Sequence, residues 1–410
     1  MRVPLLTLIR SRFDLRKKKE KSESTLTPTT PTSPTSATTT TSDDDDDNYR
    51  LKTGHASINS VVHSNSKSRT ESAGLGKPKP QAATTTTTTP RLLDLTVDNI
   101  TPNTNLINSE CSDPRLRYIM ERLVTHLHDF ARETRLSTSE WMIGLNFLVS
   151  CGQISSEVRQ EFILLSDVLG LSLLVDSIDH PKPPNSTEGS VLGPFHTHDA
   201  PVLENGASMT SDPEGIPMLA LCTVKDTDGN PISGVKIDIW ETDSSGNYDV
   251  QHSERDEPSE RCVMVSDDNG KFWFKGIKPV SYPIPNDGPV GKMLQLLGRH
   301  CWRPSHMHFM FEKPGWDHLI TALYLRGDPY ETSDAVFGVK ESLIVDLKTV
   351  NDQMAQQYGM KEGDLLLEYD FVLVTERQTQ ALRDSNAIKA MRDLGLTMKL
   401  VDHLPVPDVD

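Results

Sequence analysis

The stretch VKIDIW, at residues 235–240, alternates apolar side chains with others along the chain. Val235, Ile237 and Ile239 share one face of an extended strand, because successive side chains of a strand point to opposite faces. Further short β-rich runs follow from about Gly189 onward, separated by Asp-Gly, Asn-Gly and Pro-Gly turns. These runs lie at residues 219–224, 271–274, 307–311, 319–325 and 365–374. Many short strands with frequent turns predict a β-sandwich or a barrel.

Two long segments, residues 243–263 and 280–304, interrupt the predicted strands. Long loops inside a compact domain usually carry function, so candidate site residues are sought there first. After the last strand, residues 377–396 predict a helix with a polar face, followed by a short tail.

The part of the chain that precedes the strands, from residue 91 to about 180, has helical patterns. Asp113 and Pro114 make a good helix start, and apolar residues then recur at steps of three and four up to Phe130. A second helix is predicted from Ser137 to a stop near Gly152, and a third from residues 155–157 onward. The result is a small helical unit whose apolar faces suit a partner subunit or the next domain.

Residues 1–90 have a biased composition, with Ser, Thr and Pro dominant, aspartates at 43–47 and threonines at 84–89. Large apolar residues are sparse, so little burial would offset the entropy lost on ordering, and a disordered tail is predicted. The first 21 residues are basic and partly apolar. We interpret them as a solvated basic tail, with a transit peptide as the alternative.

Overall composition excludes several classes of protein. The 410 residues include 42 Lys and Arg against 58 Asp and Glu, a net charge of −16, which argues against a nucleic-acid partner. The sequence has no run of 18 apolar residues, so no membrane span is predicted. The five cysteines are scattered and form no CxxC pair, so a reduced, cytoplasmic protein is predicted, with mitochondrial import as the alternative.

His306 and His308 begin one of the predicted strands and, as residues i and i+2, point to the same face. Two imidazoles on one face can chelate one metal ion, although such a pair is a weak signal by itself. His196 and His198 form a second pair in a proline-rich loop, which we interpret as structural. Tyrosines lie in both long loops, but composition and spacing alone do not single them out.

Taken together, the motifs from Leu192 to about Val345 resemble the intradiol ring-cleaving dioxygenases. The preceding helices are also similar to the N-terminal helical domain of that family. The matching segments, in the family's order, are residues 192–195, 228–235, 240–248, 282–291, 303–309, 327–330 and 334–339.

The resemblance implies one non-haem ferric ion per subunit, held by Tyr248, Tyr282, His306 and His308, with O2 as co-substrate. Two phenolates and two neutral imidazoles are a hard, anionic donor set that suits Fe(III). The resemblance also implies that Tyr282 leaves the metal and helps to take a substrate proton, whereas Tyr248 stays bound. Arg303 would stabilise the electron-rich ring during oxygen attack, because its charge is permanent.

The resemblance is closest to the hydroxyquinol (benzene-1,2,4-triol) 1,2-dioxygenases of aromatic compound catabolism. It implies cleavage between two adjacent hydroxylated carbons, giving 3-hydroxymuconate or maleylacetate; the alternative is catechol, giving cis,cis-muconate. Asp176 would accept a hydrogen bond from the third hydroxyl, or else it is a helix-end or N-cap carboxylate. The substrate-lining positions implied by the subgroup are Leu173, Asp176, Leu192, Gly193, Pro194, Phe195, Ile284, Pro285 and Val336.

One position departs from the catechol-cleaving members. They carry a glutamine near Ala322, whose side chain cannot form a hydrogen bond. The alanine is expected to change the shape of the pocket that takes O2, the rate of the reaction or its specificity. It leaves the four implied ligands unchanged.

The sequence therefore predicts a mainly β protein in four parts. These are a disordered tail (1–90), a helical dimerisation domain (91–188), a β-sandwich catalytic domain (189–376) and a C-terminal helix and tail (377–410). The resemblance implies a homodimer formed through the helices, and family members can hold a lipid between them. Two other interpretations are a zinc hydrolase that uses the His306 and His308 pair, which leaves both tyrosines unexplained, and a non-catalytic β-sandwich binding module.

Overall fold

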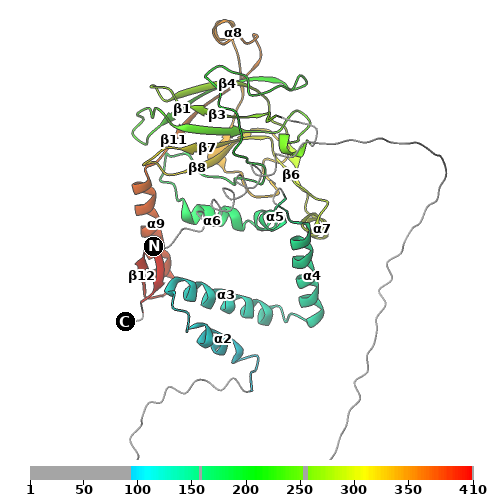
Figure 1. Cartoon of the computed structure of the whole chain (residues 1–410), viewed down its shortest axis with the longest axis vertical. Helices are drawn as coiled ribbons and strands as arrows, with labels where there is room; N and C mark the ends of the chain where they lie inside the picture. Colours follow the sequence, from blue (N-terminus) through cyan, green and yellow to red (C-terminus); the bar gives the residue numbers. More distant parts are fainter. Residues whose placement is uncertain (1–93, 157–158, 253–256, 409–410) are drawn as a thin grey trace, which may run out of the picture. The chain divides into compact units, whose positions relative to one another are not determined.

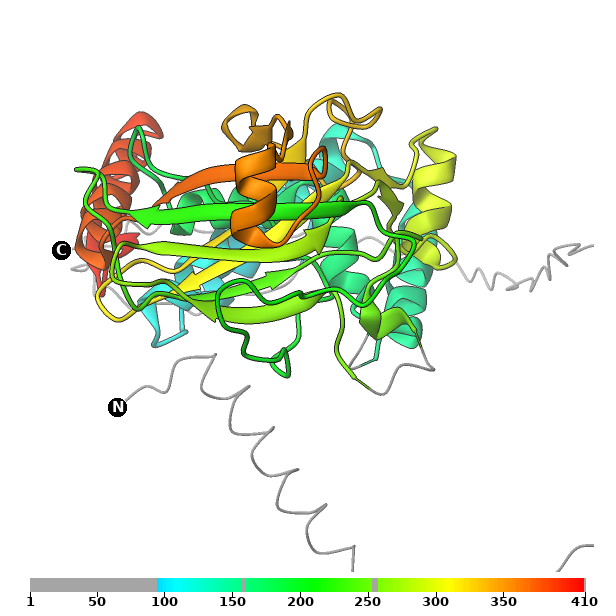
Figure 2. The same ribbon diagram turned by 90° about the horizontal axis from the view of Figure 1, so that it is seen from above.

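Two β-sheets pack face to face in the computed structural model, which describes residues 94–156, 159–252 and 257–408 (Figure 1). The first sheet has four strands in the order β10-β11-β1-β4, and β1 pairs in parallel with β11 and antiparallel with β4. Viewed from above, β1, β4 and β11 lie side by side, with the short helix α8 across them (Figure 2). The bounds are β1 (Pro217–Lys225), β4 (Lys271–Ile277), β10 (Lys348–Thr349), β11 (Leu365–Val372) and α8 (Asp352–Tyr358).

The second sheet has five strands in the order β3-β2-β7-β8-β9. The pairs β3–β2, β2–β7 and β7–β8 are antiparallel, and β8–β9 is parallel. The bounds are β2 (Lys236–Trp240), β3 (Arg261–Val265), β7 (His306–Glu312), β8 (Leu319–Leu325) and β9 (Ile344–Val345).

The main core lies between the two sheets, where the predicted alternation places its apolar side chains. Ile237 and Ile239 of β2 and Phe309 of β7 pack there with Phe272 of β4 and Phe371 of β11, all fully buried. Burial of each such side chain stabilises the fold by about 2 kcal/mol. The predicted β-sandwich is thus confirmed.

The other face of the five-stranded sheet is also covered. Asp238 and Trp240, on the face of β2 opposite to Ile237 and Ile239, are buried as well. Trp240 belongs to a second apolar cluster that includes Leu164 and Val168 of helix α5. Figure 1 shows α5, α6 and α7 beside this sheet. A β-sheet covered on both faces can enclose a site on the helical side.

The helices before the sandwich form the predicted N-terminal helical region. Asp113 caps α3 by accepting from the backbone amides of Arg115 and Leu116, and Ser137 and Glu140 form a capping box on α4. The helix predicted from residues 155–157 begins later, at Glu161. The bounds are α2 (Ile100–Asn108), α3 (Pro114–Glu133), α4 (Thr138–Ile154), α5 (Glu161–Val168) and α6 (Leu171–Asp179).

Several short elements lie where loops or a tail were expected. The second long loop contains the two-stranded pair β5 (Tyr282–Pro283) and β6 (Trp302–Arg303), together with α7 (Pro289–Leu296). The first long loop contains the 3-10 turn η1 (Asp249–Gln251) and runs into β3; a second 3-10 turn, η2 (Glu341–Leu343), precedes β9.

The C-terminal segment does not form the expected tail. After α9 (Glu376–Asp393), strands β12 (Met398–Val401) and β13 (Leu404–Pro407) form a hairpin. The hairpin packs against α3, where Arg115 donates to the Pro405 carbonyl at 2.7 Å. The predicted tail at residues 1–90 lies outside the described residues, and the three boundaries between the four predicted parts stay predictions. None of the helices in the described part of the chain combines the length and apolarity needed to cross a bilayer.

Candidate metal and catalytic site

His306 and His308 lie on the helix-covered face of β7, in the middle of the five-stranded sheet. Met307 and Phe309, which alternate with them, point into the core between the sheets. The register places His308 opposite Trp240 of β2 and opposite Ala322 of β8. The strand pairing therefore fixes both imidazoles on one surface.

Tyr248 and Tyr282 reach the same place from the two long loops. The turn before Tyr248 is closed by Asp243, whose carboxylate accepts from the amides of Ser245 and Asn247. Gly246 in this turn has φ +83°, and a Cβ there would lie 3.3 Å from Cβ of Tyr282. Glycine thus supplies both the left-handed turn and the close approach of the two loops.

The pair β5–β6 sets Tyr282 directly opposite Arg303. Arg303 precedes His306 by three residues, so strand β6 places the guanidinium next to the first residues of β7. Tyr248, Tyr282, His306, His308 and Arg303 are each at most 3% exposed.

The four aromatic side chains form a closed ring of neighbours. Ring centroids are 5.2 Å apart for Tyr248 and Tyr282, 5.5 Å for Tyr282 and His306, 4.6 Å for His306 and His308, and 6.5 Å for His308 and Tyr248. The polar tips also meet: the two tyrosine oxygens are 3.3 Å apart and the two Nε2 atoms are 3.0 Å apart. All four residues thus present their polar atoms to one another.

The hydrogen bonds of His306 assign its tautomer. Nδ1 lies 2.6 Å from the Pro304 carbonyl, which can only accept, so Nδ1 carries the proton. Nη1 of Arg303, which can only donate, lies 3.0 Å from Nε2, so Nε2 carries a lone pair. Burial and Arg303 lower the pKa of His306 well below its usual value, and burial and His306 do the same for the pKa of His308. Both imidazoles are therefore neutral, as metal ligands must be.

The donors fit a ferric ion. Within the described residues, no group of three or more His, Cys, Asp or Glu side chains is placed to hold a metal, so a metal site here needs the tyrosine oxygens as well. A metal-bound histidine usually donates its other N–H to a carbonyl, as His306 does to Pro304. Burial and Tyr282 raise the pKa of Tyr248 well above its usual value, so a metal has to displace its proton on binding.

Family models and known proteins match this chain over the same region. The model described as "Catechol dioxygenase N terminus" matches residues 113–187, and the model described as "Dioxygenase" matches residues 191–375. An intradiol ring-cleavage dioxygenase of Aspergillus niger is 68% identical over 321 residues, which are 78% of this chain and 98% of that protein.

The chain belongs to the intradiol ring-cleavage dioxygenases.

Two further relatives agree with this assignment. A hydroxyquinol 1,2-dioxygenase of a Rhizobium species is 45% identical over 267 residues, which are 64% of this chain and 90% of that protein. The solved structure of a hydroxyquinol 1,2-dioxygenase from Pseudomonas putida is 41% identical with a TM-score of 0.65, covering 68% of this chain and 99% of that one. The protein is therefore a ring-cleaving dioxygenase, and this family uses non-haem iron and O2.

In this dioxygenase, Arg303 is held along one edge of its guanidinium and open along the other. Nε and Nη2 donate to the two carboxylate oxygens of Asp334 at 3.1 and 3.2 Å, and Nη2 also donates to the Tyr324 hydroxyl at 3.1 Å. Nη1 faces the cluster, 3.4 Å from the Tyr282 hydroxyl. Burial opposes the charge, but Asp334 and Tyr282 raise the pKa of Arg303 well above its usual value, so the cation persists.

Gly338 leaves no room for a side chain behind Arg303. A Cβ there would lie 2.7 Å from the Tyr324 hydroxyl and 2.8 Å from Nη2 of Arg303. We expect Gly338→Ala to lower kcat about tenfold, because overpacking of a buried site costs about 1–3 kcal/mol and here it displaces the guanidinium. Oxygen uptake with an aromatic diol or triol measures the change. Gly152→Ala in α4, where the new Cβ meets only ordinary contact with Phe162, is the control; equal rates in the two variants would contradict the prediction.

A buried ion pair ties the Tyr248 turn to the loop at residues 192–198. Arg261 forms an ion pair with Asp249 and also donates to the Thr197 hydroxyl at 2.7 Å and to the Phe195 carbonyl at 3.1 Å. The ring of Phe195 stacks on Tyr248 with centroids 4.6 Å apart. On the other side of the cluster, the Trp240 ring stacks on His308 at 4.8 Å and 4°. Packing thus holds the rings of Tyr248 and His308 in fixed planes.

The predicted substrate-lining residues fall into two groups. Leu173, Phe195, Ile284 and Val336 pack in the apolar cluster that contains Tyr248 and Tyr282, and a Cβ on Gly193 would lie 3.9 Å from Nε2 of His308. Pro194 and Pro285 are half-buried, and Leu192 is 37% exposed.

Asp176 lies inside α6, one turn after Leu173 on the same face, and Gly170 is the N-cap of that helix. The N-cap alternative for Asp176 is therefore wrong, whereas the helix-end alternative stands, because Asp176 lies in the last turn of α6. Burial raises the pKa of its carboxyl, with His180 opposing.

Sequence reasoning missed four residues next to the site: Ser190, Trp240, Tyr324 and Asp334. Tyr324 could have been found, because it lies two residues after Ala322 and so shares its strand face, opposite His306. The contact between Asp334 and Arg303 joins residues 31 positions apart, so no local sequence pattern predicts it.

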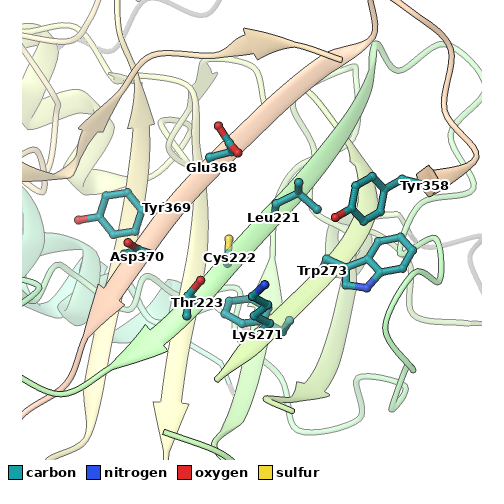
Figure 3. A pocket seen from close by; sticks show the side chains of 10 residues that line it. Leu221, Cys222, Thr223, Lys271, Trp273, Tyr358, Glu368, Tyr369 and Asp370 are labelled. Carbon is teal, nitrogen blue, oxygen red and sulfur yellow. The ribbon is translucent and has the colours of Figure 1, made fainter. Parts of the chain in front are cut away.

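One hollow of about 450 Å³ lies away from this site, over the outer face of the four-stranded sheet. Figure 3 shows Glu368 and Asp370 along β11, with Trp273 and Tyr358 together at one end. None of the cluster residues lines this hollow.

Proposed function

We propose that the protein cleaves hydroxyquinol with O2 between its two adjacent hydroxylated carbons, giving 3-hydroxymuconate or maleylacetate. We further propose one Fe(III) per subunit, held by Tyr248, Tyr282, His306 and His308. The convergence of these four buried side chains beside Arg303 carries the proposal. The hydroxyquinol 1,2-dioxygenases among the relatives support the choice of substrate.

The metal, when bound, supplies a Lewis-acidic centre that draws electron density from the substrate oxygens. The protein's own groups do the remaining work. Tyr282, which would hold the metal as a phenolate, would accept a proton from a substrate hydroxyl on leaving the metal, and its oxygen lies 3.4 Å from Nη1 of Arg303. Arg303 places a permanent positive charge where the ring becomes electron-rich, and the buried setting strengthens its effect. The packed rings of Phe195 and Trp240 exclude water from the ligand side chains.

The visible absorption spectrum of the iron-loaded protein tests the ligand set. Tyrosinate bound to Fe(III) gives a broad charge-transfer band and a red-brown colour, and hydroxyquinol added without oxygen should alter the band as Tyr282 leaves. Oxygen uptake then ranks hydroxyquinol against catechol. A protein that stays colourless after iron loading would overturn the ferric-tyrosinate site.

Catechol is the alternative substrate, and Asp176 is the residue that we propose decides between the two. Its partly buried carboxylate lies on the same helix face as Leu173, which packs against the site cluster. A buried acceptor that is satisfied only by a third ring hydroxyl disfavours a ring that lacks it.

We expect Asp176→Asn to lower the ratio of kcat/KM for hydroxyquinol to kcat/KM for catechol by roughly 10- to 100-fold. The loss should fall on hydroxyquinol, because catechol has no third hydroxyl to bind. Asp179→Asn makes the same charge change on the same helix at a side chain that is 51% exposed, and it should leave the ratio unchanged. An unchanged ratio in Asp176→Asn would remove this residue from the specificity argument.

We also propose a homodimer formed through the helical region. Five apolar side chains on one face of α3 are 45% to 56% exposed in the single chain, and a contiguous apolar stripe of this kind often marks an interaction surface. These are Leu116, Ile119, Leu123, Leu127 and Phe130. Sedimentation should give twice the chain mass, and Leu123→Glu should shift it toward the single chain; a monomeric wild type would contradict the proposal. A lipid between the helices stays a prediction.

We propose a cytoplasmic location, in which the five free cysteines stay reduced. Imaging of the full chain with a C-terminal fluorescent tag tests it, and a mitochondrial signal would favour the transit-peptide alternative.

A further inference from the structure

The surroundings of Arg303 contain a hydrogen-bonded chain whose direction can be assigned. Nη2 of Arg303 donates to the Tyr324 hydroxyl at 3.1 Å, because a guanidinium has no acceptor. The Ser190 hydroxyl donates to the Gly338 carbonyl at 2.8 Å, because a carbonyl has no proton to give. The Ser190 proton is thus committed, so the 2.9 Å contact between Ser190 and Tyr324 is donated by Tyr324.

The chain closes on itself through Asp334. The amide of Gly338 donates to Oδ2 of Asp334 at 2.8 Å, and Asp334 accepts from Arg303. The circuit therefore runs from Arg303 through Tyr324, Ser190, Gly338 and Asp334 back to Arg303. Its four polar side chains are at most 6% exposed, so water does not compete for these bonds.

The circuit occupies one edge of the guanidinium and leaves the other for the substrate side. Nε and Nη2 are the bound nitrogens, and Nη1 alone faces Tyr282 and His306. Asp334 alone would neutralise the charge of Arg303 and fix the position of one edge of its guanidinium. Tyr324 adds a third direction, since it meets Nη2 from strand β8, on the face that also carries Ala322.

We propose that Tyr324 and Ser190 are positioning residues that hold the Arg303 guanidinium in the orientation needed for ring cleavage. This inference rests on the proposed function, in which Arg303 faces the electron-rich ring. It assigns a role to a third buried tyrosine that is not one of the four proposed ligands. A charge that is already oriented stabilises the transition state without reorganisation during the reaction.

Steady-state kinetics on the iron-loaded full chain tests the role. Tyr324→Phe should lower kcat for hydroxyquinol about tenfold, the effect of losing one hydrogen bond to a charged group, and should leave KM within about twofold. The charge-transfer band should be unchanged, because Tyr248 and Tyr282 are intact. Tyr369→Phe is the matched control: it removes from β11 a hydroxyl that donates to the Ser342 carbonyl, and it should keep the wild-type kcat.

Two further comparisons separate positioning from a general loss of structure. Ser190→Ala should reproduce the effect of Tyr324→Phe, and the double variant should be no slower than either single one, because both act through one chain. In an Arg303→Lys background, Tyr324→Phe should change kcat by less than about twofold, since the guanidinium that it positions is gone. The proposal would be overturned if the tenfold fall in kcat persisted in the Arg303→Lys background. It would also be overturned if the effects of Tyr324→Phe and Ser190→Ala on kcat multiplied in the double variant, or if Tyr324→Phe kept the wild-type kcat.

The iron-free protein gives a readout that does not depend on turnover. In protein labelled with 15N-arginine, a held guanidinium gives separate, slowly exchanging Nη–H signals, and Arg303→Lys identifies those of Arg303. Tyr324→Phe should merge them, and unchanged signals would overturn the positioning role. If wild-type protein consumes no O2 with hydroxyquinol or catechol, the proposed function fails, whereas the NMR comparison still decides whether Tyr324 orients Arg303.

Discussion

Replacing Tyr248 by phenylalanine is expected to weaken and shift the charge-transfer band of the iron-loaded protein, since Tyr282 remains as the other phenolate, and to lower turnover roughly a thousandfold or more, on the scale seen when a charge-stabilising group is lost from a buried site. Phenylalanine fills the same volume between Phe195 and Tyr282, so the fold should tolerate the change. It removes one of the two phenolate oxygens that offset the ferric charge. The visible spectrum, the iron content and oxygen uptake measure the three consequences.

Tyr369→Phe serves as the control for Tyr248→Phe, because it also removes one hydroxyl from the catalytic sandwich. That variant should keep its colour and its rate. If Tyr248→Phe were as coloured and as active as the wild type, Tyr248 would not be a ligand.

Arg303→Lys is expected to lower kcat by about 10²- to 10³-fold while the red-brown colour stays. A lysine keeps the positive charge but cannot meet both oxygens of Asp334 and the Tyr324 hydroxyl at once. The four proposed ligands are untouched, so loss of rate without loss of colour separates the work of the arginine from that of the metal. Stopped-flow single turnovers, read at the charge-transfer band, measure the chemical step directly.

Arg326→Lys is the control for Arg303→Lys. Arg326 is half-exposed, pairs with Asp346 and lies away from the ligands, so the change should leave kcat unaltered. A wild-type rate in Arg303→Lys would show that only charge, and not the guanidinium fork, is needed at this position.

Much of the sandwich could be predicted because its strands carry local patterns. The alternation of Ile237 and Ile239 with Asp238 and Trp240 predicted β2, and the HxH spacing predicted a shared face for His306 and His308. The alternation does not tell whether the opposite face is exposed: Asp238 and Trp240 are buried there, in contact with His196 and with the apolar cluster that includes the helices. A two-residue period reports which side chains share a face, not what lies over it.

The parts that escaped prediction are long-range or very short. Strands β5 and β6 have two residues each, too few for any periodicity, yet their pairing sets Tyr282 opposite Arg303. The β12–β13 hairpin has weak alternation and owes its place to packing on α3. Asp334, Ser190 and Tyr324 meet Arg303 only in the folded chain, so no local motif could assign them.

The side chains of the site come from two different parts of the fold. The ring of Tyr248, Tyr282, His306 and His308 comes from the sheet and its loops, whereas Leu173 reaches the same cluster from α6. We therefore expect mutations in α6 to alter which rings are accepted while the four proposed ligands stay in place. We expect a laboratory library confined to α6 to vary the substrate range while most of its members stay active.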